Sequence, residues 1–221
     1  MPQFRYFAAA LGLAMMAAPA SAKVVATSDD GFVTKASASV SATPREAWLA
    51  LIKPGAWWND SHTWSGDAAN MTLVPSAGGC FCEKIPGEGD IPLDGSSQHA
   101  IVVQAVPDKA LRLRGGLGPL QAVPATGVLT ITLHEIDGGT RIDWEYNVGG
   151  PMGIPVAQIS KAVDSVMTQQ LMGLRDHLGA LDGDTEQAPD EAKVDEEEPG
   201  DFEKAFETPE EPAEEAPATD E

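Results

Sequence analysis

Two cysteines, Cys80 and Cys82, lie one residue apart in the stretch GGCFCE. Cysteine side chains form disulfides, bind metals or fill small apolar spaces. Residues two apart on a strand point to the same face, with Cα atoms about 6.6 Å apart, which is near the upper limit for a disulfide. A local contraction or a bulge, which Gly78 and Gly79 permit, would bring the two sulfurs into bonding range.

Three roles for this pair stay open on the sequence alone. In an oxidising compartment a Cys80–Cys82 disulfide is the first expectation, and its very small loop would stabilise the fold little. Two buried thiols are the second reading. A zinc or copper site is the third, with His62 or His99 as further ligands, although the spacing matches no recognised zinc pattern. The disulfide is therefore predicted, and a metal site is not.

Polar groups suited to acid–base chemistry are scattered through the middle of the chain. A general acid–base pair needs two such groups within hydrogen-bond reach in a pocket. Asp143 and Glu145 share the strand face opposite Trp144 and Tyr146, which predicts that they face solvent. The chain has no nucleophile elbow, phosphate-binding glycine loop or His-rich metal helix motif. No catalytic residue and no cofactor are therefore predicted, and the polar candidates are His62, Asp67, Glu83, His99, Arg112, Arg114, Asp143 and Glu145.

The N-terminal segment has the features of a secretory signal peptide. Arg5 supplies the positive charge, an apolar run follows to about Ala18, and Ala20-Ser21-Ala22 has the small-x-small pattern of a cleavage site. The apolar run is shorter than the roughly 20 residues that cross a bilayer. We therefore expect residues 1–22 to be removed, with no membrane span elsewhere and a periplasmic or secreted location.

The C-terminal segment, residues 182–221, is strongly acidic. It holds 18 Asp or Glu against two Lys, so it carries −16 of the chain's formal charge of −20 and leaves −4 for the rest. Low apolar content, proline and self-repulsion predict disorder there. Without a basic patch, nucleic-acid binding is not expected. Phe202 and Phe206 fit a short docking motif for a protein partner, and the alternative interpretation is a solvated tail.

The remaining residues, 23–181, are long enough for one domain with one core. A strand is expected over 31–41, followed by a short helix that Thr43 caps and that Pro54-Gly55 ends. Further strands are expected over 70–74, 79–85, 98–106 and 110–115. A hairpin over 127–148 turns near Asp137, and a long amphipathic helix covers 155–181, with Gln169 and Gln170 on its polar side. This order favours an α+β fold in which a twisted antiparallel sheet packs on the final helix.

Several stretches resemble the START/Bet v 1-like (SRPBCC) superfamily and its helix-grip fold. They are the segment VSATPREAWLALIKPGAWW, the strand LVPSAGGCFCEKI, the hairpin VVQAVPDKALRLRG and the closing helix VAQISKAVDSVMTQQLMGLRDHL. The Gly78-Gly79 turn is similar to that of the Hsp90-ATPase-activator-like and polyketide-cyclase-like branches. Activation of cytosolic Hsp90 is not expected of this chain, because export separates it from that partner and from ATP.

The resemblance implies a curved sheet wrapped around the long helix, with a cavity between them that takes a small hydrophobic molecule. From strand alternation and helix period, the expected ligand-binding residues are Phe81 or its Cys neighbours, Leu113, Trp144, Tyr146, Val163 and Met167. The aromatic loop adds Trp57, Trp58 and Trp64. The three loop tryptophans are expected at the entrance. Ordinary core packing is the competing reading for Trp144 and Tyr146.

Two other functions remain as alternatives to ligand carriage. A cyclase- or hydrolase-like enzyme would use the same cavity and would show a buried cluster of His and carboxylate groups. A partner-binding scaffold would have a filled interior. The fold class alone does not separate these functions.

Overall fold

Alternation of apolar and polar residues produces the two longest neighbouring strands, β7 (Thr126–Ile136) and β8 (Gly139–Gly149). Their register closes the hairpin at Ile136 and Gly139. On β8 the inward face is buried and carries Ile142, Trp144, Tyr146 and Val148, as the alternation predicts. The computed structural model describes residues 23–87, 89 and 93–181.

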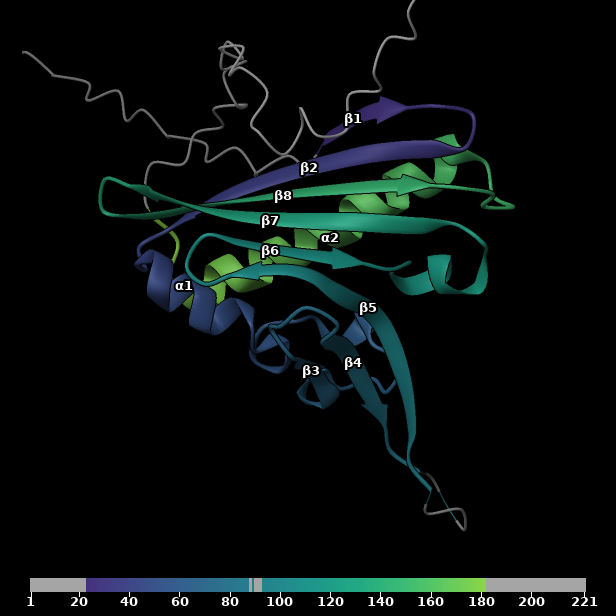
Figure 1. The fold of residues 1–221 in the computed structure, drawn as a ribbon, viewed down its shortest axis with the longest axis horizontal. Helices are drawn as coiled ribbons and strands as arrows, with labels where there is room; N and C mark the ends of the chain where they lie inside the picture. The colour runs from purple at the N-terminus through teal and green to yellow at the C-terminus, as the bar shows by residue number, and fades with distance from the viewer. Residues whose placement is uncertain (1–22, 88, 90–92, 182–221) are drawn as a thin grey trace, which may run out of the picture. The chain divides into compact units, whose positions relative to one another are not determined.

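Eight antiparallel strands form one sheet in the order β1-β2-β8-β7-β6-β5-β4-β3 (Figure 1). Each neighbouring pair is antiparallel, and the fold class expected from the sequence is confirmed. The remaining strands are β1 (Lys23–Thr27), β2 (Gly31–Val40), β3 (Met71–Leu73), β4 (Cys80–Ile85), β5 (Gly95–Val106) and β6 (Ala110–Arg114).

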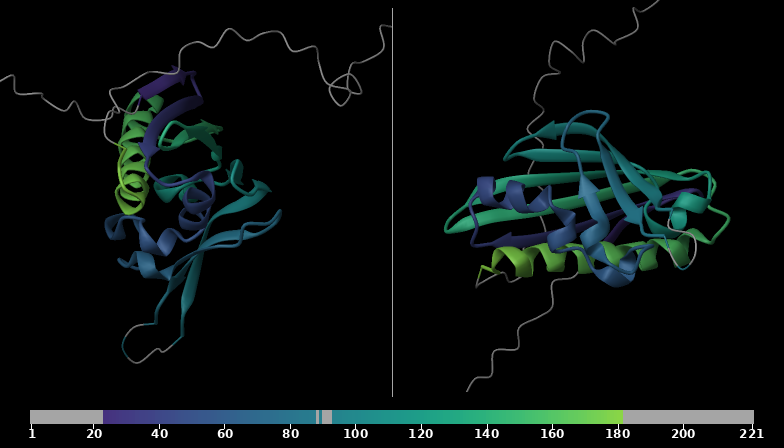
Figure 2. Two further views of the ribbon diagram at one scale, coloured as in Figure 1. Left: turned by 90° about the vertical axis from the view of Figure 1, so that its left-hand side faces the viewer. Right: turned by 90° about the horizontal axis from the view of Figure 1, so that it is seen from below.

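The long helix α2 (Val156–Leu178) lies against β1, β2 and α1, and the sheet curves over it (Figure 2). Its buried face contains Ile159, Val163, Met167, Leu171 and Leu174, which are spaced near the helical period. The arrangement is the helix-grip geometry that the resemblance implied, and the helix packs on the sheet as its amphipathic pattern predicted.

A short helix and an irregular segment connect β2 to β3. Helix α1 (Pro44–Leu51) begins with the expected capping box, in which Thr43 and Glu46 bond each other's backbone N–H groups. Residues 56–70, here called the aromatic loop, then contain the 3-10 turns η2 (Asp60–His62) and η3 (Ala68–Asn70). The turn η1 (Pro54–Ala56) leads into the loop, and η4 (Gly118–Ala122) follows β6.

The structure differs from the sequence-based expectation in three places. Strand β1 was not expected, and β5 begins at Gly95 rather than at residue 98. Gln170 was expected on the polar side of α2 but is fully buried. The signal peptide predicted for residues 1–22 and the acidic tail predicted for 182–221 lie outside the described residues. Within the described part of the chain, no helix is long and apolar enough to span a membrane.

Candidate functional site

Glu83 is a buried acid on the inward face of β4, with 1% of its surface exposed. Its carboxylate accepts hydrogen bonds from the backbone N–H of Trp64 (3.0 Å) and of Ser65 (2.5 Å). The third donor is Nε2 of His99 at 2.9 Å. Burial raises the pKa of the Glu83 carboxyl, but these hydrogen bonds outweigh it and hold the pKa below the usual 4.5. The carboxylate is thus a fixed negative charge beneath the aromatic loop.

A bulge in β5 explains how His99 reaches this carboxylate. Phe81 pairs with Ala100 and Cys82 pairs with Gln98, so His99 is an extra residue with no partner across the ladder. Strand alternation would place neighbours on opposite faces, yet His99 and Ala100 are both buried. The bulge therefore turns the imidazole inward beside the Phe81 ring, with the two ring centroids 5.4 Å apart.

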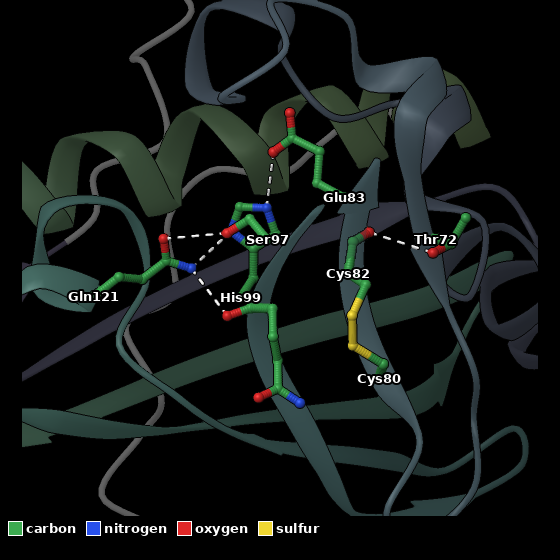
Figure 3. Close-up of a disulfide and its surroundings, with 8 residues drawn as sticks. Thr72, Cys80, Cys82, Glu83, Ser97, His99 and Gln121 are labelled. Atoms are coloured by element: carbon green, nitrogen blue, oxygen red, sulfur yellow. Dashed lines mark hydrogen bonds and ion pairs between the residues drawn. A yellow bond between two sulfur atoms is a disulfide. The ribbon is translucent and has the colours of Figure 1, made fainter. Parts of the chain in front are cut away.

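Gln121, on η4, fixes the proton arrangement of His99 (Figure 3). The indole N–H of Trp64 is a donor only, and it lies 2.8 Å from Oε1 of Gln121, which sets the orientation of the amide. The amide nitrogen then donates to the Gln98 carbonyl (3.1 Å) and to Nδ1 of His99 (3.3 Å). Nδ1 is the acceptor, so the imidazole proton lies on Nε2, toward Glu83.

A pocket of about 240 Å³ opens beside this group. Gly115 allows β6 to approach β5 closely here, because a Cβ at this position would lie 2.3 Å from the carbonyl oxygen of His99. Buried Leu120 and Ala125 contribute the apolar part of the pocket lining, and polar side chains contribute the rest. We call this space the His99 pocket, and its lining residues are Gln98, His99, Ala100, Arg114, Gly115, Gly116, Leu120, Gln121, Val123 and Ala125.

The interior between the sheet and the loop contains a second, smaller cavity of about 20 Å³. A space of this size holds about one water molecule. Nε1 of Trp144 is buried in its wall and has no hydrogen-bond partner among the described residues. We call it the inner cavity, and it is lined by Leu51, Pro54, Trp57, Trp58, Leu73, Phe81, Leu111, Leu113, Leu129, Ile131 and Trp144.

A row of ring contacts joins the two spaces. Trp144 contacts Trp57 with centroids 6.1 Å apart, and Trp57 contacts Trp58 at 5.5 Å. Trp58 contacts Phe81 at 5.3 Å, and Phe81 contacts His99. Phe81 lines the inner cavity and His99 lines the pocket, so these two rings form the partition between them.

The aromatic loop is held on α2 by the buried amide of Gln170. Its oxygen accepts from the backbone N–H of Asn59 (2.9 Å), and its nitrogen donates to Nδ1 of His62 (2.6 Å). Gly173 allows the loop to come close to the helix, since a Cβ there would lie 2.6 Å from the Trp57 carbonyl oxygen. The loop is thus fastened to the helix by Gln170 and to the sheet by Glu83.

The residues expected to bind a ligand fall into three groups. Five line the inner cavity: Trp57, Trp58, Phe81, Leu113 and Trp144. Tyr146, Val163 and Met167 are buried in the core but line neither space. Trp64 is 55% exposed and reaches the His99 pocket through its bond to Gln121.

Tyr146 has a structural contact of its own at the end of β6. Its hydroxyl donates to the Gly115 carbonyl (2.9 Å) and accepts from the Leu117 N–H (3.1 Å). Burial raises the pKa of the Tyr146 phenol to about 12, and the bond from Leu117 lowers it in part. Gly127 makes room for the ring, because a Cβ at that position would lie 2.3 Å from it.

Cys80 and Cys82 are joined by a disulfide, with Cα atoms 5.3 Å apart. They are partly exposed and alternate with the buried Phe81 and Glu83, so the disulfide lies on the outer face of the sheet. The bulge at His99 lies directly across from it on β5. No group of three or more His, Cys, Asp or Glu residues within 23–87, 89 and 93–181 is arranged to hold a metal ion.

The other polar candidates serve local structure. Asp143 bonds Ser37 and Arg141 on the outer face, and Glu145 pairs with Lys35 at 2.8 Å. The remaining candidates also have local roles: Asp67 caps η3, Arg112 bonds Thr130, and Arg114 lines the His99 pocket. Sequence reasoning named Glu83 and His99 separately but missed their pairing and missed Gln121, because the bulge and the turn η4 have no clear sequence signal.

No protein-family model matches this chain, and no curated protein sequence matches it. Among solved structures, an uncharacterized protein of Rhizobium leguminosarum is similar at 17% identity with a TM-score of 0.50, over 73% of this chain and 98% of that one. A protein of Rhodobacter sphaeroides is also similar, at 18% identity with a TM-score of 0.45, over 72% of this chain and 98% of that one. A protein of Mesorhizobium loti is similar at 19% identity with a TM-score of 0.47, over 66% of this chain and 96% of that one. The first likeness supports the fold alone.

Proposed function

We propose that this protein binds a small amphipathic molecule on the concave side of its sheet. The observation that carries this proposal is the N–H of Trp144, which is buried and has no hydrogen-bond partner among the described residues; Trp144 lines a cavity whose other side chains are aromatic and aliphatic. A buried donor without a partner is costly, and a ligand acceptor or one water would satisfy it. Apolar lining with a few polar groups is typical of ligand sites.

The polar end of the ligand is assigned to the His99 pocket. This pocket has the larger volume, about 240 Å³, and exposes the polar groups of His99 and Gln121. Its wall adjoins the inner cavity through Phe81 and His99. An elongated molecule would therefore pass Phe81 to bring its apolar part to the tryptophans.

Entry requires movement, because the inner cavity of about 20 Å³ accepts nothing larger than a water molecule. The aromatic loop is the segment placed to move. Its side chains Trp57 and Trp58 form part of the cavity wall. Polar bonds attach the loop to Gln170, Glu83 and Gln121, and the indole N–H of Trp57 donates to the Ala50 carbonyl. Rotation of Trp58 away from Phe81 would enlarge the cavity.

Native mass spectrometry of the protein purified from its own host tests the proposal. A co-purifying small molecule with an apolar part is the expected result. Binding of that molecule should weaken five- to tenfold in Trp144→Phe, which keeps an aromatic ring but removes the N–H together with part of the indole. Trp48→Phe is the matched control, because Trp48 is buried but lies outside both spaces. Equal weakening in both variants, or no adduct, would count against the proposal.

A second candidate function is acid–base catalysis in the same pocket. The buried Glu83–His99 pair favours it, because a carboxylate that fixes one imidazole nitrogen leaves the other as a base. In that case the co-purifying molecule would be converted by the protein and left unchanged by His99→Asn. Mass spectrometry of the small-molecule fraction separates the two functions.

Membership of the START/Bet v 1-like superfamily and export to the periplasm or outside the cell belong to the same proposal. The helix-grip arrangement and the Cys80–Cys82 disulfide are consistent with them. N-terminal sequencing of the protein from its host is expected to begin at Lys23. A mature chain that retains Met1 would contradict export by a cleaved leader.

A further inference from the structure

We propose that the His99 pocket selects ligands whose polar end is a neutral hydrogen-bond donor, a hydroxyl or an amide N–H, over ligands that end in a carboxylate. This inference rests on the proposed function and names the class of its ligand. The observation that supports it is the row of hydrogen bonds that joins Glu83, His99, Gln121 and Trp64. This row places the acceptor nitrogen of the His99 imidazole beside the pocket.

The donor and acceptor roles along this row are set from both ends. Trp64 can only donate, so Gln121 turns its oxygen to the indole and its NH₂ group to His99. At the other end the Glu83 carboxylate can only accept, so it holds the proton on Nε2. Because the NH₂ group of Gln121 donates, Nδ1 of His99 is the acceptor of this hydrogen bond.

A ligand group that displaces the Gln121 amide from Nδ1 must replace a donor. The Nδ1 bond to Gln121 is the longest polar contact of His99, at 3.3 Å, against 2.9 Å for the bond to Glu83. Exchange at Nδ1 therefore costs less than exchange at Nε2. A hydroxyl or an amide N–H restores the hydrogen bond, whereas an ether or a carboxylate leaves the buried acceptor unpaired.

Charge adds to this discrimination. The Glu83 carboxylate lies behind the imidazole, is 1% exposed and stays ionised. A ligand carboxylate at Nδ1 would bring a second negative charge to the same ring, in surroundings that screen it poorly. Arg114 is the positive side chain on the pocket wall, and it is exposed, so water screens its attraction for an anion.

Three probes that share a 4-butylphenyl group and differ in the polar end test the inference on the full chain. They are 4-butylphenol, 4-butylanisole and 4-butylbenzoate, titrated at pH 8 and followed by calorimetry or tryptophan fluorescence. The phenol is a neutral donor, the anisole has only an acceptor, and the benzoate is an anion. We expect the phenol to bind at least about tenfold more tightly than either of the others.

Two variants make the result specific to His99. Gln121→Ala removes the competing amide and should strengthen phenol binding relative to the other two probes. Arg112→Gln, which removes a positive charge from the same strand outside the pocket, should leave the preference unchanged. Benzoate or anisole binding as tightly as the phenol would overturn the inference and leave ligand binding intact. Failure of all three probes to bind would overturn the proposed function and the inference together.

Discussion

Replacement of Glu83 by Gln should destabilise the protein far more than its single lost charge suggests. The two carboxylate oxygens accept from three donors, the N–H groups of Trp64 and Ser65 and the Nε2–H of His99. A Gln amide keeps one acceptor oxygen and places an NH₂ group where the other was. At least one buried donor would then face another donor.

The size of the effect follows from that conflict. Losing one hydrogen bond to a charged group costs about 1.5–3 kcal/mol, and a buried donor left without a partner costs about 1–3 kcal/mol. We expect a total loss of roughly 3 kcal/mol or more in the free energy of unfolding. For a chain of this size, that lowers Tm by about 6–12 °C.

Urea unfolding and calorimetry at pH 7 measure the loss, with Glu145→Gln as the matched control. Glu145 also lies on a strand, but its ion pair with Lys35 is almost half exposed, 45% for Glu145 and 47% for Lys35. Such surface pairs contribute about 0–1 kcal/mol, so the control should stay close to the parent protein. A Glu83→Gln variant as stable as the control would refute the account of the buried carboxylate.

The pH dependence gives this prediction a second test. The pKa of Glu83 in the folded protein is below the usual 4.5, so the ionised group stabilises the fold above that value. The stabilisation is lost as pH falls through the folded pKa. The gap between the parent protein and Glu83→Gln should therefore be widest near neutrality and should narrow below pH 4.5.

Three further predictions concern the sheet. In a chain that starts at Lys23, Tyr146 is the single tyrosine. A pH titration followed by ultraviolet absorbance should show its phenol ionising at about pH 12, and a titration midpoint near pH 10 would contradict its burial. Gly127→Ala should lower the free energy of unfolding in urea by about 1–3 kcal/mol, because its Cβ would lie 2.3 Å from the Tyr146 ring. Gly149→Ala is the control; a Cβ there would have no atom within 4 Å, so the change should be less than about 0.5 kcal/mol. Intact mass should show two hydrogens missing from Cys80 and Cys82, and a double serine variant should lose only about 1–2 kcal/mol, because the loop is so small.

The elements with strong periodicity could be predicted from the sequence. Alternation on β8 and the helical period of α2 located the core faces, and the capping box at Thr43 and Glu46 located the start of α1. Boundaries were less predictable, because β1 is short and mostly exposed and has no alternating apolar face.

The candidate site was only partly predictable, for a reason specific to bulges. Strand alternation assigns each residue one face, and this rule placed Trp144 inward but left open whether Phe81 or its cysteine neighbours face inward. It could not settle the direction of His99, because the extra residue in β5 shows only in the pairing with β4. Gln170 was misassigned because its buried partners, Asn59 and His62, come from a loop distant in sequence.

Because His99 is the extra residue in β5, the site could lose its imidazole without a change in the pairing of the strands. Excising position 99 would leave Ala100 opposite Phe81 and Gln98 opposite Cys82, so the ladder on either side could keep its pairing. The imidazole alone would disappear, and with it the acceptor beside the pocket. A one-codon deletion at this point is thus a route by which evolution or a protein engineer could switch ligand preference without rebuilding the curved sheet.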